Sequence, residues 1–263
     1  MTEAASMFSD GKAYERMMGR WSRVAGTTFL DWLDPPKGQR WLDAGCGNGA
    51  FTEEIVARSA PAAVSAVDPS EGQIAYARKR PAAQHAQFEI GDAQKLDFED
   101  NSFDVAIMAL VIAFLPDPAR AAAELARVVR PGGSVATYMW DVEAGGTPIS
   151  PVGAALKSLG ITPGQPPNPP ASGRDAMQAF WDNAGLVDVE TRVIRIPVVY
   201  SSLDDFWDSN IVPIGPMGAL LGKMTSGERE QLRARLREQL PIAADGSISY
   251  DAVANAVKGR VKP

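Results

Sequence analysis

The chain has 263 residues, 45% of them hydrophobic, and 26 Lys and Arg stand against 32 Asp and Glu, for a formal charge of −6. This length and hydrophobic content suit one large domain, and the acidic balance argues against a nucleic-acid partner, because phosphate binding needs clustered cations. The longest apolar run, residues 105–115, is shorter than the roughly 18–20 residues of a membrane-spanning helix. We therefore expect no membrane span. The N-terminus also lacks the basic and apolar segments of a secretory signal, so a cytoplasmic location is predicted.

Residues 40–141 alternate short apolar runs with helical segments, which is typical of a parallel sheet covered on both faces. The predicted strands are 40–44, 63–68, 86–91, 103–110 and 134–140. The helix before the last strand is the best defined, because Asp117 can cap its start and Pro118 suits its first turn. The fold class is therefore α/β.

The second half of the chain begins with a segment rich in Gly and Pro, residues 142–173, which we expect to form a loop or cap over the sheet edge. A helix over 174–184 and a long strand over 186–200 follow, and the strand's apolar alternation changes parity, which predicts a bulge near Val193 or Ile194. Thr225 and Glu228 form a capping-box pattern for a surface or lid helix. The last residues, from 246 on, read as a turn and a final strand that pairs with the long one.

The most informative segment is WLDAGCGNGAF, residues 41–51, in which a buried strand leads into Gly45, Gly47 and Gly49 and then a helix. Such a loop lets backbone approach a ligand closely. Gly45, Gly47 and Ala50 also satisfy the looser dinucleotide pattern, so nicotinamide binding must be weighed.

Three acids at predicted strand ends decide whether the ligand is a nicotinamide dinucleotide or another adenosine cofactor. Asp43 would meet a cationic ligand group rather than a pyrophosphate. Asp68 can accept hydrogen bonds from two ribose hydroxyls, which any adenosine cofactor allows. Asp92 is positioned for an adenine amino group, with the Ala93 N–H as a partner for a ring nitrogen. Adenosine joined to a zwitterionic amino acid describes S-adenosylmethionine.

Four segments carry a resemblance to a known family: LDAGCGNG (42–49), AVDPSEGQIAYAR (66–78), GDAQKLDFEDNSFDVAIMA (91–109) and ELARVVRPGGSV (124–135). In order and spacing the chain resembles class I S-adenosylmethionine-dependent methyltransferases of the type 11, ubiquinone and menaquinone biosynthesis group, over roughly residues 38–141. The resemblance implies a Rossmann-like, doubly wound, seven-stranded sheet of order 3-2-1-4-5-7-6 with an antiparallel last strand, helices on both faces and a small helical or loop cap. Residues 14–23 resemble a leading helix that folds over the cofactor.

The same resemblance assigns the cofactor contacts. It implies that the methionine part lies at the glycine loop, the ribose at Asp68 and the adenine at Asp92, while the Ala109 carbonyl faces the methionine ammonium. The implied cofactor-binding residues are Asp43, Gly45, Cys46, Gly47, Asp68, Pro69, Gln73, Asp92, Ala93, Ala109 and Leu110. We expect Cys46 to pack there rather than act as a nucleophile, because no activating base is visible.

The acceptor side has weaker signals. Several relatives have His or Gln near the position of Ala113, and this chain does not, so an inherited general base is in doubt. Asp141 and Tyr14 are the candidates for a base. The substrate-pocket candidates are Tyr14, Arg20, Trp21, Phe114, Trp140, Phe206, Trp207 and Asn210. The single histidine, His85, is predicted to lie at the surface, and with the single Cys46 it leaves no cluster for a Cys/His metal site, so we predict no metal.

We interpret residues 1–263 as one methyltransferase domain: a helical lid (1–36), a cofactor-binding core (38–141), the Gly- and Pro-rich loop (142–173), a substrate cap (200–245) and a last strand (246–263). The predicted reaction is in-line transfer of a methyl group from S-adenosylmethionine to a small-molecule acceptor, leaving S-adenosylhomocysteine. A cofactor-binding module without turnover is the alternative. An NAD-dependent oxidoreductase is less favoured, because the chain has no YxxxK and no His in its motifs. Monomer and homodimer both stay open.

Overall fold

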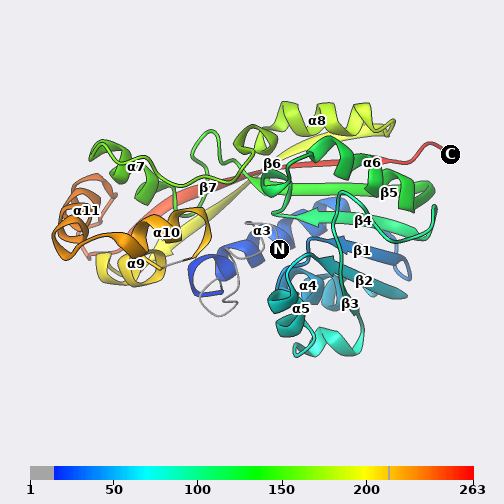
Figure 1. Cartoon of the computed structure of the whole chain (residues 1–263), viewed down its shortest axis with the longest axis horizontal. Helices are drawn as coiled ribbons and strands as arrows, with labels where there is room; N and C mark the ends of the chain where they lie inside the picture. Colours follow the sequence, from blue (N-terminus) through cyan, green and yellow to red (C-terminus); the bar gives the residue numbers. More distant parts are fainter. Residues whose placement is uncertain (1–14, 213) are drawn as a thin grey trace.

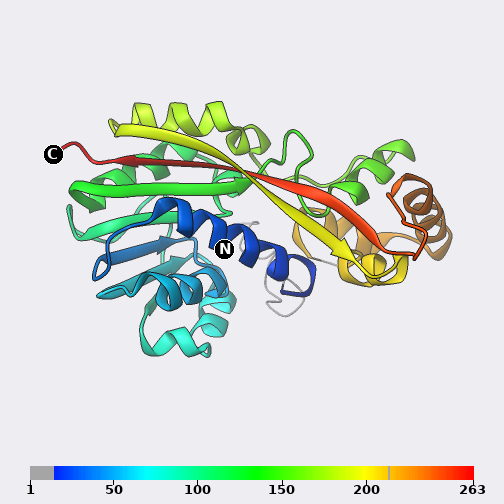
Figure 2. The same cartoon turned by 180° about the vertical axis from the view of Figure 1, so that it is seen from behind.

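The structure is a computed structural model that describes residues 15–212 and 214–263. Figure 1 shows an elongated molecule with an α/β core at one end and a group of helices at the other, connected by two long strands. We call that second part the cap; it comprises residues 142–173 and 200–245. Figure 2 shows from behind that the first long helix lies along the sheet, between the two ends of the molecule.

The core is a seven-stranded sheet of order β3-β2-β1-β4-β5-β7-β6. β7 runs antiparallel to both of its neighbours, and the other pairs are parallel. The predicted strand order and the antiparallel last strand are thus confirmed. The strands are β1 (Arg40–Ala44), β2 (Ala63–Asp68), β3 (Gln87–Ile90), β4 (Phe103–Ala109), β5 (Val129–Trp140), β6 (Val187–Tyr200) and β7 (Ile248–Arg260).

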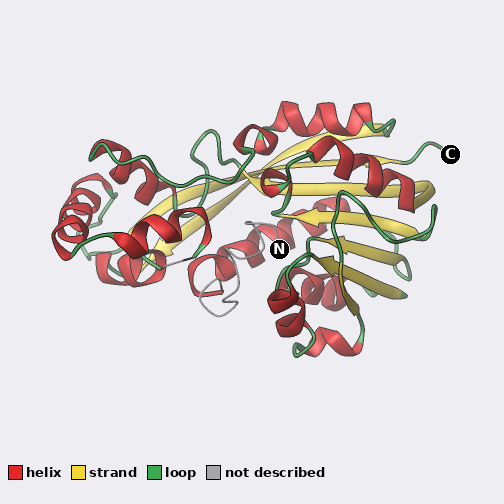
Figure 3. Cartoon of the chain, viewed as in Figure 1, coloured by secondary structure: helices red, strands yellow, loops and turns green. Residues whose placement is uncertain are grey.

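Helices surround this sheet and build the cap, as Figure 3 shows. The described α-helices are α3 (Arg20–Leu33), α4 (Ala50–Ser59), α5 (Glu71–Ala77), α6 (Pro118–Val128), α7 (Ser150–Ser158), α8 (Arg174–Asn183), α9 (Leu203–Asn210), α10 (Gly215–Lys223) and α11 (Ser226–Gln239). Shorter helical segments are η1 (Glu15–Gly19), η2 (Pro81–Gln84), η3 (Ile112–Phe114) and η4 (Pro169–Ser172). None of these helices is long and apolar enough to cross a membrane.

Both faces of the central strands are buried, and successive residues pack into different clusters. Trp41 and Ile107 pack with α3 and α4 on one face, whereas Leu42 and Ala106 pack with α6 and α8 on the other. This alternation is what a parallel sheet between two helical layers requires. α6 begins as predicted, because the Asp117 carboxylate accepts the Arg120 N–H at 3.0 Å. The parallel order brings the ends of β1, β2 and β4 to one sheet edge.

The bulge predicted near Val193 is wrong. The pairing of β6 with β7 is continuous from Glu190 to Tyr200, and the register shift lies earlier, between Val187 and Glu190. Asp188 lies within that interval and has a φ of 53°, outside the extended region. The change of parity at Val193 has another cause: α8 covers one face of the first half of β6, and α3 and the cap cover the opposite face of the second half.

The segment expected as a loop or cap, residues 142–173, contains α7 and η4. Val152, Ala155 and Leu156 form a fully or almost fully buried face of α7 that packs against α11. The reciprocal face of α11 carries Leu232 and Leu236, both fully buried. The predicted capping box of α11 is present, with Thr225 and Glu228 bonded in both directions. The cap therefore has an apolar interior of its own, joined to the core through β6 and β7.

Candidate cofactor and acceptor site

The glycine loop lies between β1 and α4, at the carboxyl edge of the sheet. Gly45 and Gly47 have φ values of 82° and 54°, in the left-handed region that favours glycine. A Cβ on Gly45 would lie 2.5 Å from Val111 Cγ2, so packing also excludes a side chain there. Gly47 differs, because nothing lies within 4 Å of the position its Cβ would take. The loop therefore presents bare backbone to an open space.

Asp68, at the end of β2, holds this loop in place. Its Oδ2 accepts the Gly47 N–H at 3.0 Å, and its Oδ1 accepts the Ser70 N–H at 2.9 Å. Burial raises the pKa of Asp68, and these two backbone hydrogen bonds act in the opposite direction. The carboxylate thus connects the ends of β1 and β2, which is also where a ribose would lie against it.

Asp43 lies beneath the loop rather than on its open side. Its side chain is fully buried, and Oδ2 accepts the Thr52 hydroxyl at 2.7 Å. Oδ1 has no hydrogen-bond partner among the residues that the structure describes. Burial raises the pKa of Asp43 to about 7, against the lowering effect of Thr52. Near neutral pH this acid is therefore present in both protonation states.

A cavity of about 800 Å³ opens above the glycine loop, between the carboxyl ends of the strands and the cap. It brings together most of the residues that the sequence indicated. Those lining it are Gly45, Cys46, Gly47, Asp68, Pro69, Gln73, Asp92, Ala93, Ala109, Leu110, Phe114 and Trp140. Ligands of open α/β sheets bind at this edge, so the cavity is the principal candidate site.

Other predicted residues lie away from the cavity. Arg20 has its guanidinium carbon 4.2 Å from the centroid of the Trp21 ring and 4.6 Å from that of Tyr200, so it fastens α3 to the end of β6. Asn210 Nδ2 donates to the Tyr200 hydroxyl at 3.0 Å, and the Phe206 ring packs on Tyr200 at 4.9 Å. These residues form the junction between cap and core instead of a cavity wall.

Trp207 and Asp141 also lie outside the cavity lining. The Trp207 ring is half-buried and packs beneath Arg233, 5.5 Å from its guanidinium carbon. Asp141 Oδ1 accepts the Ala144 N–H at 3.1 Å and thereby caps a turn after β5. Asp43 is not part of the cavity lining either. Tyr14 lies outside the residues that the structure describes.

The cap end of the cavity is lined by residues that the sequence did not indicate. They come from η1 (Met17, Met18), from β5 (Tyr138), from α7 (Lys157) and from the two segments 163–167 and 214–217. Tyr138 could have been found, because it lies two residues before Trp140 and alternation places both on one face. No local sequence pattern indicates that α7 and residues 214–217 line the cavity, because they reach it only when the cap packs against the core.

The backbone at the end of β4 is strained where it lines the cavity. Leu110 has a φ of 62°, uncommon for a residue other than glycine, and its N–H donates to the Tyr138 carbonyl at 2.8 Å. This turn directs the chain from β4 into η3 along the cavity wall. A strained residue that a hydrogen bond holds at a ligand cavity is typical of a functional site.

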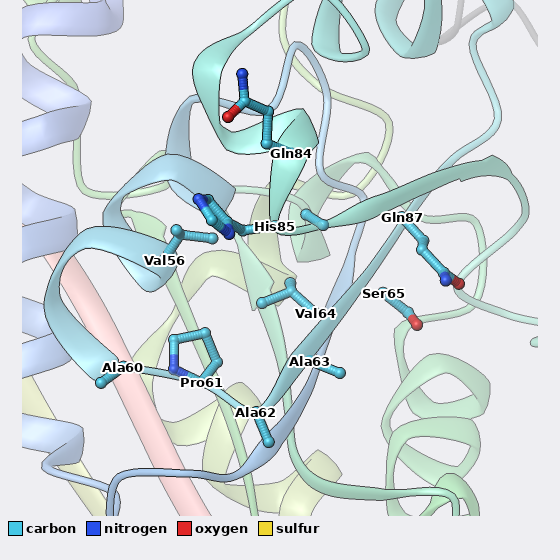
Figure 4. Close-up of a pocket in the computed structure, with 11 residues that line it drawn as sticks. Val56, Ala60, Pro61, Ala62, Ala63, Val64, Ser65, Gln84, His85 and Gln87 are labelled. Carbon is cyan, nitrogen blue, oxygen red and sulfur yellow. The ribbon is translucent and has the colours of Figure 1, made fainter.

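Cys46 lines the cavity but is poorly suited to nucleophilic chemistry. Burial raises the pKa of its thiol well above the ordinary range, and the nearby Asp43 and Asp68 add to that effect. His85 cannot activate it, because this residue is exposed in a hollow of about 670 Å³ near the start of β2, at the opposite edge of the sheet (Figure 4). No cluster of three His, Cys, Asp or Glu that could hold a metal ion occurs within 15–212 and 214–263.

Comparisons with known proteins agree with this geometry. Residues 42–137 match the family described as methyltransferase domain. The chain is 34% identical over 131 residues to a malonyl-[acyl-carrier protein] O-methyltransferase of Serratia marcescens, which is 50% of each chain. It is 35% identical over 121 residues to a ubiquinone/menaquinone biosynthesis C-methyltransferase of Dinoroseobacter shibae, covering 44% of this chain and 48% of that protein. The chain thus spans about half the length of the curated relatives it matches.

Solved structures share the fold over most of the chain. A putative methyltransferase of Bacillus halodurans superposes with a TM-score of 0.59 at 16% identity, covering 90% of this chain and 99% of that one. Phosphoethanolamine N-methyltransferase 2 of Haemonchus contortus, solved with S-adenosyl-L-methionine, gives 0.59 at 20% identity, covering 95% of this chain and 56% of that one. The sheet order is that of class I S-adenosylmethionine-dependent methyltransferases. Residues 42–137 carry the type 11 methyltransferase domain, and the cofactor of this domain is S-adenosylmethionine.

The residues present fit this cofactor. The cavity is roomy, its glycine loop is bare at Gly47, and it carries the Asp68 and Asp92 carboxylates as acceptors for hydroxyl and amino groups. Asp92 Oδ1 accepts the Gln94 backbone N–H at 2.9 Å, and Oδ2 accepts the Gln94 side-chain amide at 3.4 Å, so Oδ2 has lone-pair capacity left for a further donor. These two hydrogen-bond acceptors thus suit an adenosine rather than a pyrophosphate.

Proposed function

We propose that this protein transfers the methyl group of S-adenosylmethionine to a small-molecule acceptor bound in the same cavity. The observation that carries the proposal is the single cavity that joins the glycine loop to the interior of the cap. Its volume of about 800 Å³ lies within the usual range for ligand pockets. Donor and acceptor can therefore be held side by side.

The family resemblance and the geometry together support a set of cofactor contacts. Asp68, with Pro69 and Gln73 beside it, would hold the ribose, and Asp92 with Ala93 would hold the adenine. The methionine part would lie along Gly45, Gly47 and the turn at Ala109 and Leu110, with Asp43 behind the loop as a partly ionised acid. When bound, the cofactor supplies a methyl group that is already activated by a sulfonium.

The described lining residues contribute positioning and water exclusion rather than proton transfer. The acids among them are Glu54, which pairs with Arg23 at 3.5 Å, and the two carboxylates given to the cofactor. The Cys46 thiol is held protonated by its burial. Apolar walls and fixed geometry are sufficient for an in-line displacement when the acceptor is itself a nucleophile at neutral pH.

Calorimetric titration with S-adenosylmethionine, S-adenosylhomocysteine and NAD tests the cofactor part. We expect the first two to bind to the wild type and NAD not to bind. Asp68→Ala should weaken that binding at least tenfold, because it removes the ribose acceptor and releases the Gly47 N–H. Asp175→Ala, at an exposed position of α8, is the matched control and should bind as the wild type does.

Turnover is tested separately by measuring S-adenosylhomocysteine release with pools of small molecules. Release that Asp68→Ala abolishes supports the enzyme. Retained cofactor affinity without release for any pool would favour a binding module, and binding of NAD alone would refute the proposed cofactor chemistry.

A further inference from the structure

Helix α7 of the cap lines the cavity with small residues and one lysine. Ser150, Gly153, Ala154 and Lys157 all line it, and their spacing places them on one side of α7. The opposite side of α7 is buried against α11. Because the lining residues before Lys157 are small, this face leaves room for a ligand and places one long cationic side chain at the end of the helix.

Lys157 has no acidic partner in the part of the chain that the structure describes. No carboxylate of a described residue lies within 4.0 Å of its ammonium. The only other cation among the described lining residues, Arg23, is paired with Glu54. The acids Asp68 and Asp92 lie at the strand ends, in the core, whereas α7 belongs to the cap (Figure 1). The cavity is thus acidic at its cofactor end and carries an uncompensated positive charge at its cap end.

The walls between these two ends are mainly apolar. Ile149, Ile214 and Met217 come from the cap, and Met18 and Trp140 from the core side. An acceptor that fills this space must therefore have an apolar body. A charged group on it would gain from Lys157 only if that group were negative, since a low-polarity wall strengthens attraction and repulsion alike.

We propose that the methyl acceptor is an amphipathic anion, with an apolar body lying between η1 and the cap and a carboxylate or phosphate group bound by Lys157. This inference rests on the proposed function, because it takes the cap end of the cavity as the acceptor site. Lys157 lines the cavity and is exposed to solvent. Its effect on affinity is therefore modest, of the size expected for a partly solvated charge pair.

The test uses decanoate, decyl phosphate and the neutral decanamide as probes of one apolar body with different head groups. Each is titrated by calorimetry into the full chain, with and without S-adenosylhomocysteine. We expect at least one anionic probe to bind about fivefold more tightly than decanamide. Preference for decanoate assigns a carboxylate acceptor, and preference for decyl phosphate assigns a phosphate.

Two variants then locate the head group. Lys157→Met should remove the preference for the anionic probe and leave decanamide binding within twofold of the wild type. Lys223→Met, an exposed lysine of α10 outside the cavity lining, is the matched control and should retain the preference. Equal binding of all three probes, no binding by any of them, or an equal loss in both variants would overturn the inference.

The outcome is independent of the proposed function's own test. If S-adenosylhomocysteine binds but the anionic preference is absent, only the inference about the acceptor fails. If S-adenosylhomocysteine does not bind, the proposed function fails, and the titrations without it still decide whether Lys157 selects an anion.

Discussion

At the scale of single residues, the site depends on acids whose surroundings differ. Asp68 is held by two backbone N–H groups, whereas Asp43 is fully buried with one hydroxyl donor and one oxygen without a partner within 15–212 and 214–263. The same side-chain type thus serves once as a half-buried anchor of the loop and once as a fully buried acid with a pKa of about 7.

Asp43 makes the stability of the cofactor-free protein depend on pH. Its pKa rises from 3.8 to about 7 on folding, so its contribution is present below about pH 4 and is lost as pH rises through about 7. The shift corresponds to a loss on the order of 4 kcal/mol in the free energy of unfolding between low and high pH. We expect Asp43→Asn to lack this dependence, as measured by urea unfolding at pH 5 and pH 8.

The control for this prediction is Asp175→Asn, which changes an exposed carboxylate of α8 in the same way. It should keep the wild-type pH dependence. If Asp43→Asn and the wild type lose the same stability between pH 5 and pH 8, the buried acid is ionised throughout and the assignment is wrong.

At the scale of elements, two cap segments that line the cavity touch each other at Gly164. A Cβ on Gly164 would lie 1.9 Å from the Pro216 carbonyl oxygen, so the segment 163–167 touches the start of α10 through bare backbone. Both segments line the cavity. The absence of a side chain at Gly164 therefore allows these two segments of the cavity wall to touch.

Gly164→Ala should separate these segments. We expect it to lower the free energy of unfolding by about 1–3 kcal/mol, as an overpacked contact does, and to speed cleavage of the segment 163–167 in limited proteolysis. Gly227→Ala, in the first turn of α11 with nothing within 4 Å of its Cβ position, is the control and should be neutral or slightly stabilising. Unchanged stability and proteolysis in Gly164→Ala would show that the two segments part freely.

The elements of the core could be predicted from the sequence, because their signals are local. β1 and β2 begin and end at the predicted residues, and the Asp117 cap and the Thr225 capping box are present as expected. The sequence does not predict α7, because the helix has only 9 residues and contains Pro151 in its first turn and Gly153 within it. The bulge was misplaced, because a change of covering layer produces the same parity change as an inserted residue.

The candidate site likewise has a part that the sequence predicts and a part that it does not. Its cofactor half lies on loops that directly follow strands, so strand order alone assembles it. Its acceptor half is built from residues 149–167 and 214–217, which are distant in sequence and meet only when the cap packs. Arg20, Trp21 and Phe206 resembled pocket residues by composition, but they pack around Tyr200 at the junction.

At the scale of the whole molecule, β6 and β7 run through both core and cap (Figure 2). Tyr200 and Ile248 pair at the cap end of these strands, and Val187 and Arg260 pair at the core end. Contacts of Arg20 and Asn210 with Tyr200 add side-chain connections across the same junction. Cap and core should therefore unfold together, as the proposed single domain implies.

Calorimetric unfolding tests this cooperativity. We expect one transition whose calorimetric and van't Hoff enthalpies agree, with coincident curves from circular dichroism and tryptophan fluorescence. Two resolved transitions would mean that the cap is a separate folding unit. Tyr200→Ala should shift the single transition to lower temperature without splitting it, because the shared strands stay intact.

The acceptor wall enters the chain as two insertions, one between β5 and β6 and one between β6 and β7. Neither insertion interrupts β1, β2 or the glycine loop, which come earlier in the chain. On the proposed function, exchanging or resizing these insertions should change the acceptor while the glycine loop keeps its backbone. We therefore expect new acceptor specificities to be reachable by changes within residues 142–173 and 200–245, while the segments before residue 142 stay unchanged.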